Sequence, residues 1–215
     1  DKLVEDDDDT YYVDGNGVMV TNTWVKVVNE DQDDDDDPAE YHYYYMQSNG
    51  KAYKGNGTSV SKKTIDGKRY AFDEDGVMLY GWVTETGTMA NGEDEWSGSD
   101  VKYYFGGWED GSMKTGSQSI KDNTGDTIQV LLLYKKIRIR TKYTTPEEGN
   151  QLKKGAGVVG NQSNKLYYYG LLLTADDYKY QVANVGGYDF IINSNGSIQH
   201  SYVQHTKRMA ILLSL

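Results

Sequence analysis

The stretch from Lys62 to Val83 reads KKTIDGKRYAFDEDGVMLYGWV and sets the pattern for the rest of the chain. It contains two turn dipeptides, Asp66-Gly67 and Asp75-Gly76, which lie nine residues apart. Both residues of such a dipeptide adopt positive φ at low cost, which favours a tight hairpin turn. Between the turns, Arg69–Phe72 has room for one short strand. The stretch therefore predicts a hairpin that is too small to bury a core of its own and needs neighbours of the same kind.

The same pattern recurs along the chain: aromatic residues, a polar turn that ends in glycine, one further residue, and then an apolar residue. The copies are Tyr11–Met19, Tyr43–Ala52 and Tyr103–Gly116, followed by the weaker Leu166–Leu171 and Phe190–Ile198. Their turn glycines are Gly17, Gly50, Gly76, Gly111, Gly170 and Gly196. Repetition of so small a unit is typical of a solenoid, in which stacked units share one core. We predict an all-β solenoid of stacked short β-hairpins, with insertions because the glycines are unevenly spaced.

These residues resemble the bacterial cell-wall-binding repeats that choline-binding and glucan-binding proteins share. The strongest match is Tyr70–Trp82, the recognisable copies cover Tyr11–Gly116, and the likeness continues more weakly to Gln199. The resemblance implies a secreted protein at the cell surface, attached to a cell-wall polysaccharide or to teichoic acid. It also implies that the chain is part of a larger secreted protein, and the start at Asp1 without an initiator methionine fits a mature fragment.

The sequence predicts two parts. Residues 1–116 carry the cell-wall-binding-type hairpin repeats, and residues 117–215 are expected to form divergent β repeats with a basic strand segment. That segment is Ile128–Tyr143, in which apolar and basic residues alternate strictly over Ile137–Arg140. A loop at Thr144–Lys154, with Pro146 and two glutamates, is expected to separate the halves. The tail after His200 fits no part of the repeat pattern.

The composition argues against several classes of partner and site. The net charge of −11 disfavours nucleic acid and anionic membrane surfaces. No stretch approaches the roughly 20 apolar residues of a membrane-spanning helix, so we expect no membrane insertion. With no cysteine, the chain has no disulfide, thiolate metal site or thiol nucleophile. The 20 tyrosines and 24 glycines suit short strands, many turns and half-buried rings with solvated hydroxyls. The acidic run Asp33–Asp37 is interpreted as a solvated loop.

Recognisable catalytic and cofactor motifs are missing from the sequence. It has no His-Glu-x-x-His helix motif, nucleophile elbow or phosphate loop. The stretch Gly155–Gly160 matches the dinucleotide fingerprint in letters, but a polar loop precedes it and Asn161–Asn164 follows in place of a helix. His200 and His205 are five residues apart, a weak metal signal. We predict no catalytic residue, no metal site and no cofactor.

The resemblance implies which aromatic residues meet a ligand. In choline-binding members the cage comprises the tryptophan of Gly-Trp, an aromatic before the Tyr-Tyr pair, and a tyrosine of the next hairpin. The aromatic before the pair is kept in this chain only at Tyr43, since the matching positions hold Thr10, Arg69 and Lys102. A cation repels a quaternary ammonium ion, so glucan or another wall polysaccharide is favoured over choline. The expected ligand-binding set is Trp24, Tyr43, Tyr44, Tyr70, Trp82, Tyr103, Trp108 and Tyr167.

Three hypotheses for the function follow from the sequence. The first is non-catalytic attachment to a bacterial surface polysaccharide through aromatic side chains on the repeat array. The alternative is a structural or adhesive spacer of a surface protein, whose tyrosines are core residues and which has no sugar site. The third is an enzyme with a site in the divergent part after Ile128. Exposed aromatic rings would favour the first hypothesis over the second. A clustered pair of acidic residues in a cleft would support the third.

Overall fold

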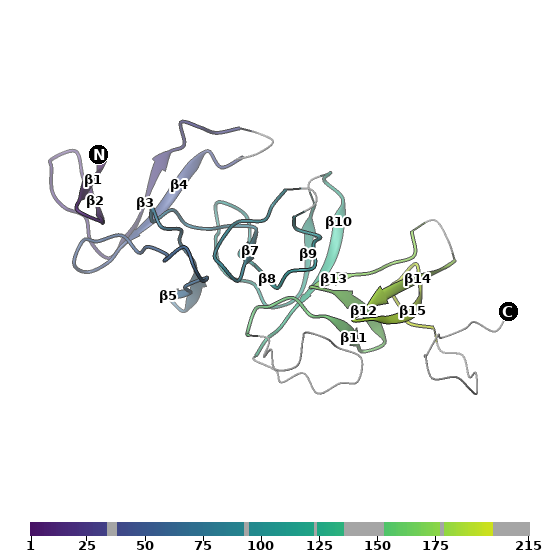
Figure 1. Cartoon of the computed structure of the whole chain (residues 1–215). Helices are drawn as coiled ribbons and strands as arrows, with labels where there is room; N and C mark the ends of the chain where they lie inside the picture. Colours follow the sequence, from purple (N-terminus) through teal and green to yellow (C-terminus); the bar gives the residue numbers. More distant parts are fainter. Residues whose placement is uncertain (34–37, 93–94, 123, 136–152, 177–178, 200–215) are drawn as a thin grey trace. The chain divides into compact units, whose positions relative to one another are not determined.

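The computed structural model describes residues 1–33, 38–92, 95–122, 124–135, 153–176 and 179–199. Within these residues every regular element is a β-strand, and the 15 strands pair into antiparallel hairpins and one five-stranded sheet (Figure 1). The predicted all-β class is confirmed. In the described part of the chain, no helix is long and apolar enough to span a membrane.

The chain divides into two compact units. The first comprises Asp1–Trp96 and Tyr104–Met113, and the second comprises Ser97–Tyr103 and Lys114–Leu215. The division passes through strand β8 (Lys102–Tyr104). Each unit has hydrophobic clusters of its own, with Phe72 and Met78 among the buried residues of the first and Leu166 and Ile192 among those of the second.

The first unit consists of two-stranded hairpins that follow one another along the chain. Its strands are β1 (Lys2–Asp6), β2 (Asp9–Val13), β3 (Thr23–Val28), β4 (Tyr41–Met46), β5 (Lys63–Ile65), β6 (Lys68–Tyr70) and β7 (Trp82–Thr84). β1 pairs with β2, β3 with β4, β5 with β6, and β7 with β8. At the predicted Asp66-Gly67 turn both residues have positive φ, 48° and 77°, as a tight hairpin requires.

Six turns among the described residues share one hydrogen-bond pattern. The opening residue donates its N–H to the carbonyl four residues later, and the glycine three residues later donates back to the opening carbonyl. In Asp73, as in Asp14, the side-chain oxygen also accepts backbone N–H groups of the turn, which is why short polar residues suit this position. The opening residues are Asp14, Gln47, Asp73, Thr84, Asp122 and Asn193.

Successive turns of the first unit are also bonded to the preceding hairpin. In three copies, the N–H of the apolar residue two positions after the turn glycine donates to a strand carbonyl of the hairpin before it. Ala52 donates to Thr10 at 2.8 Å, Met78 to Tyr43 at 2.8 Å, and Met113 to Arg69 at 2.7 Å. The acceptors Thr10, Tyr43 and Arg69 occupy the same position of the repeat, so this bond recurs from one copy to the next.

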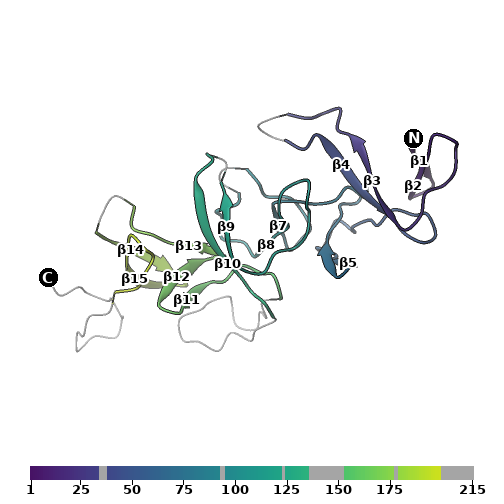
Figure 2. The same ribbon diagram turned by 180° about the vertical axis from the view of Figure 1, so that it is seen from behind.

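The second unit has a five-stranded sheet and a separate hairpin. The sheet order is β11-β12-β13-β10-β9, and β14 pairs with β15. Figures 1 and 2 both show this hairpin beside β12, and residues of both pack in one cluster around Leu166 and Phe190. The bounds are β9 (Gly116–Lys121), β10 (Thr127–Leu132), β11 (Gly160–Gln162), β12 (Lys165–Tyr168), β13 (Leu171–Leu172), β14 (Tyr180–Val185) and β15 (Tyr188–Asn193).

The predicted basic segment is described only in its first part. β10 begins at Thr127 and ends at Leu132, and it pairs antiparallel with β9. The alternating Ile137–Arg140, most of the predicted loop at 144–154, the acidic residues 34–37 and the tail after His200 lie outside the described residues. The stretch Gly155–Gly160 leads into strand β11 and the hairpin β11-β12. A dinucleotide site needs a helix at that point.

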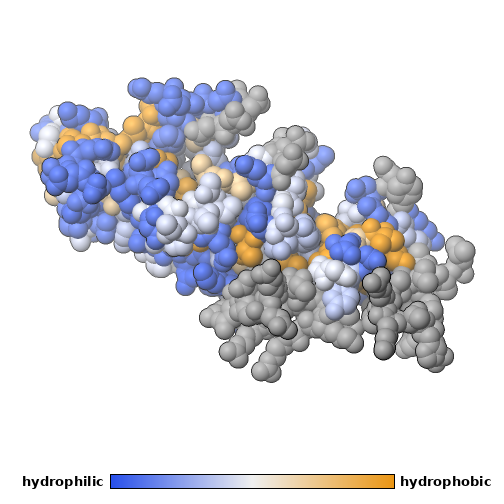
Figure 3. Space-filling model, viewed as in Figure 1, coloured by the Kyte–Doolittle hydropathy of each residue, from blue (hydrophilic) through white to orange (hydrophobic). Residues whose placement is uncertain are grey.

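The surface of the first unit is mainly hydrophilic, as expected for a chain in which 26% of the residues are charged. Most of the visible surface of the first unit is hydrophilic, with apolar surface over β1–β4 (Figure 3). The exposed apolar side chains there are Val4, Val18, Met19 and Val28.

Candidate functional site

Half-buried aromatic rings gather on the second hairpin of the first unit and on the segment that follows it. β3 and β4 pair in a register that sets Trp24 opposite Tyr45. Side chains two residues apart on a strand share a face, so Tyr43 lies on the same face as Tyr45 while Tyr44 points to the other. Tyr53 follows the turn at Gly50 and stacks on Tyr45. We call Trp24, Tyr43, Tyr45 and Tyr53 the aromatic platform.

The platform rests on a buried apolar layer. Its four side chains are partly exposed, and they pack against Ile65, Tyr70, Phe72 and Met78. The Trp24 ring meets Tyr45 and Tyr70 edge-on, with centroids 5.3 and 4.8 Å apart. Such aromatic pairs are worth about 0.5–1.5 kcal/mol beyond their area burial. The ring of Trp24 is therefore held in place by its neighbours while part of its surface stays accessible.

Stacking extends the platform. Tyr45 and Tyr53 lie nearly parallel, with an interplanar angle of 16° and centroids 5.7 Å apart. The ring centroids of Tyr43 and Trp108 lie 6.4 Å apart. The rings thus form one neighbourhood that draws on β3, β4, the segment after Gly50 and the insertion around Trp108.

The eight expected ligand-binding residues fall into two groups. Trp24, Tyr43 and Trp108 are half-buried. The other five are buried, with 9% or less of their surface exposed: Tyr44, Tyr70, Trp82, Tyr103 and Tyr167. Tyr103 has no exposed surface, so its ring contributes to the core rather than to an outer face. Contact with a ligand stays a prediction for all eight.

Two platform residues are absent from the expected set. Tyr45 ends the run Tyr43-Tyr44-Tyr45, and strand alternation in that run pairs Tyr45 with Tyr43 rather than with Tyr44. That signal was present in the sequence. Tyr53 stands outside the repeat motif, and only the fold of the segment after Gly50 brings it onto Tyr45.

Lysine and arginine side chains near the rings differ in their surroundings. The Lys63 ammonium lies over the Tyr53 ring, 5.5 Å from its centroid. Arg69 is exposed. In the second unit, Lys102 is 1% exposed, and its Nζ donates to the Gly98 carbonyl oxygen at 2.9 Å. Arg69 and Lys102 therefore supply no ring at the repeat position where a choline cage has an aromatic residue.

Burial perturbs the tyrosine hydroxyls beneath the platform. Burial, and after it the negative charges of Asp73, Asp75 and Glu5, raise the pKa of Tyr44 to about 12. Burial also raises the pKa of Tyr70, with Asp110 and Asp66 adding to the effect. These hydroxyls therefore keep their protons to a more alkaline pH than an ordinary tyrosine does.

Among the described residues, no group of three or more histidine, cysteine, aspartate or glutamate side chains could hold a metal ion. His200 and His205 lie outside the described residues.

Comparison with known proteins gives a likeness at the level of solved structures. No family model matches the chain, and no curated protein matches it. The endolysin of phage Cp-1 in complex with choline aligns with 99% of this chain and 41% of its own, at 15% identity and a TM-score of 0.40. Choline-binding protein F of Streptococcus pneumoniae aligns with 92% of this chain and 57% of its own, at 20% identity and a TM-score of 0.35.

A third similar structure is a truncated alternansucrase of Leuconostoc mesenteroides. It aligns with 60% of this chain and 10% of its own, at 17% identity and a TM-score of 0.42. This chain thus spans less than two thirds of each of these proteins. Two of the three are described with choline or as choline-binding. At these identities and TM-scores, the likeness does not carry their activities over to this chain.

Proposed function

We propose that this chain is a non-catalytic module that attaches to a bacterial surface polysaccharide through its aromatic platform. The observation that carries the proposal is the Trp24 ring, which three aromatic neighbours hold while part of it remains exposed. A fixed, half-exposed ring offers a large apolar face at little cost in conformational entropy, as aromatic residues do at binding surfaces. The C–H faces of sugar rings suit such a surface.

Glucan or another neutral wall polymer fits the platform better than choline does. A quaternary ammonium ion needs ring faces that no other cation occupies. In this chain the Lys63 ammonium already lies over the Tyr53 ring. The equivalent cage positions hold Arg69, which is exposed, and Lys102, which is buried and bonded to the Gly98 carbonyl. Polar and basic groups beside a ring instead supply hydrogen bonds to sugar hydroxyls.

The hairpins are proposed to form a solenoid. Support comes from the recurring bonds of Ala52 to Thr10, Met78 to Tyr43, and Met113 to Arg69, which repeat one geometry along the chain. An array of this kind offers several weak sites, whose joint affinity exceeds that of any one. In this proposal the chain belongs to a larger secreted protein and lies at the cell wall, with teichoic acid as a further candidate partner.

A spacer function is the second candidate. The burial of Tyr44, Tyr70 and Tyr103 favours it, because those tyrosines serve as core residues. A spacer needs hairpin stacking but no accessible ring face. The two functions differ in what happens when an exposed platform ring is removed.

Retention on purified Gram-positive cell walls tests the proposal. The wild-type chain is expected to bind and to be eluted by soluble glucan rather than by choline. Trp24→Ala should weaken retention by about tenfold, the effect of losing about 1.4 kcal/mol of binding. Val28→Ala is the matched control, since Val28 lies on the same strand and is 63% exposed. Unfolding transitions of both variants show that each is folded.

Each outcome of this test decides between candidates. Equal retention of the Trp24→Ala and wild-type chains would show that the aromatic platform does not contribute to binding. No retention of the wild type on any wall would leave the spacer. Elution by choline would overturn the argument from Lys63, Arg69 and Lys102.

A further inference from the structure

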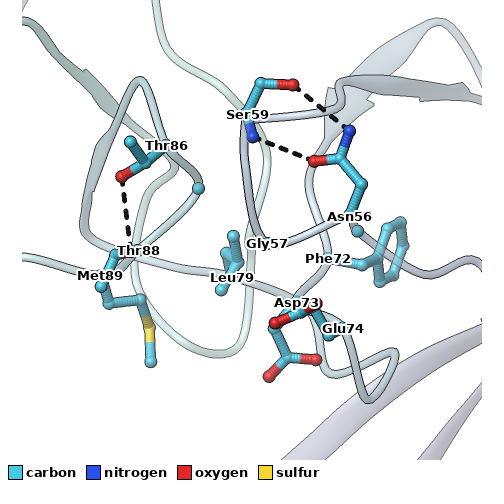
Figure 4. Close-up of a pocket in the computed structure, with 12 residues that line it drawn as sticks. Asn56, Gly57, Ser59, Phe72, Asp73, Glu74, Leu79, Thr86, Thr88 and Met89 are labelled. Atoms are coloured by element: carbon cyan, nitrogen blue, oxygen red, sulfur yellow. Dashed lines mark hydrogen bonds between the residues drawn. The ribbon is translucent and has the colours of Figure 1, made fainter.

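The first unit contains a pocket that the repeat pattern does not account for. Its volume is about 410 Å³, within the range of roughly 300–1,000 Å³ that small-molecule sites occupy. Three segments line it: the loop Gly55–Ser59, the turn start Phe72–Glu74 and the turn Thr86–Met89, with Leu79 between them (Figure 4). The loop belongs to an insertion between hairpins, so the pocket exists because of the uneven repeat spacing.

Hydrogen bonds within the two facing loops hold the pocket walls. The Asn56 side-chain oxygen accepts the N–H of Ser59 at 2.9 Å and that of Thr58 at 3.1 Å. On the opposite wall the hydroxyls of Thr86 and Thr88 lie 3.5 Å apart (Figure 4). Gly55 N–H donates to the Asp73 carbonyl at 2.6 Å, which ties the loop to the turn. The walls are thus shaped before any ligand binds.

The charge of the pocket is negative. Asp73 and Glu74 line it, and neither lysine nor arginine is among its described lining residues. The Asp73 Oδ1 atom accepts the N–H groups of Asp75 and Val77 at 3.0 and 2.7 Å. Burial raises the pKa of Asp73 despite these bonds. A bound cation would offset that unfavourable burial of charge.

We infer that this pocket binds a single sugar residue that carries a primary ammonium group. The two carboxylates accept N–H bonds from the ammonium, and charge-assisted bonds of this kind are the stronger ones. Thr86, Thr88 and Ser59 offer partners to sugar hydroxyls, and Met89, which is 36% exposed, offers an apolar contact for the ring. A quaternary ammonium group is a poor fit because it has no N–H, and the one lining ring, Phe72, is 2% exposed.

This site goes beyond the proposed function. It meets the aromatic platform at Phe72, whose ring contacts Trp24 and Tyr53. A monomeric amino sugar therefore tests the pocket even if no polysaccharide binds the platform, and a glucan that binds only the platform leaves the pocket unchanged.

Titration of the whole chain with glucosamine, monitored through backbone amide signals, is the test. We expect shifts at Gly55–Ser59 and Thr86–Met89, and none with glucose or choline at the same concentration. Glu74→Gln should weaken binding by about tenfold, as expected for one hydrogen bond to a charged group. Asp75→Asn is the matched control, because it removes the same charge one residue away from the lining. It should leave the dissociation constant within about twofold.

Three results would overturn the inference. The first is the absence of shifts in the pocket segments at high glucosamine concentration. The second is equal shifts with glucose, which would show that the ammonium is not recognised. The third is an equal loss in Glu74→Gln and Asp75→Asn, which would indicate general attraction to a negative surface. The amide spectra of the variants themselves confirm that each is folded.

Discussion

At the residue scale, the turn glycines show how one motif position serves two purposes. Gly17 and Gly111 both have positive φ, 78° and 56°, and both come two residues before a methionine. A Cβ on Gly17 would meet nothing within 4 Å, whereas a Cβ on Gly111 would clash with Met78, which is 4% exposed. Glycine is thus required by conformation at both sites and by close packing at one.

Alanine at these two glycines is expected to separate the effects. Gly17→Ala should lower the free energy of unfolding by about 1–2 kcal/mol from backbone strain alone. Gly111→Ala should lower it by a further 1–3 kcal/mol or so, because a buried methionine must move. Chemical denaturation of both variants measures the difference. Equal losses would show that Met78 does not restrict this turn.

Tyr44 gives a prediction for alkaline pH. Its pKa is raised from 10.0 to about 12 in the folded state, first by burial and then by nearby carboxylates. Between these values the folded state keeps a proton that the unfolded state has lost, so stability falls as pH rises through this window. Tyr44→Phe should make that fall shallower, as measured by denaturation at several pH values. An unchanged slope would show that Tyr44 does not carry this part of the alkaline loss.

At the element scale, the second residue after a turn glycine decides how firmly the turn is anchored. Met78 forms a bridge with Phe72 and is 4% exposed, and Met19 forms the equivalent bridge with Val13 but is 47% exposed. Met78→Ala should cost about 2–5 kcal/mol of stability, as truncation of a buried side chain does. Met19→Ala should change stability by no more than about 0.5 kcal/mol. Denaturation curves for the pair test this, and similar losses would contradict the assignment of Met78 to the core.

The hairpins could be predicted from sequence because their signals are local. Asp66-Gly67 and Asp73–Gly76 carry turn chemistry that acts within a few residues, and the structure places turns at both. The order β11-β12-β13-β10-β9 could not be predicted, because β10 meets β13 through a pairing of Val130 with Leu171 that no local pattern encodes. Partner choice between distant strands depends on tertiary packing.

The sequence predicts that aromatic residues form the candidate site, but it does not predict which of their rings are exposed. Aromatic residues on the repeats were expected, and Trp24, Tyr43 and Trp108 are half-buried. The repeat motif does not distinguish a ring at the surface from one in the core, because Trp24 and Trp82 hold the same motif position but Trp82 is 5% exposed. The pocket beside Asp73 arises from an insertion, and an insertion has no counterpart in the other copies.

At the scale of the whole molecule, the net charge of −11 distinguishes the candidate polymers. Salt screens charge–charge interactions between exposed groups, with a Debye length of about 10 Å at 0.1 M and about 3 Å at 1 M. Binding of neutral glucan by ring faces should therefore change by less than about twofold between 0.1 M and 1 M salt. An anionic polymer such as teichoic acid would bind more strongly as salt rises, because repulsion weakens. Retention on each polymer at both salt concentrations separates them.

The most direct test of the aromatic platform uses the four tryptophans of the chain as reporters. Their indole N–H signals are followed by NMR while soluble wall polysaccharide is added to the intact protein. The Trp24 signal is predicted to shift with polysaccharide concentration, and the signal of Trp82, which is 5% exposed, is predicted to stay in place. An unmoved Trp24 signal in the presence of a polymer that the chain demonstrably binds would contradict the account.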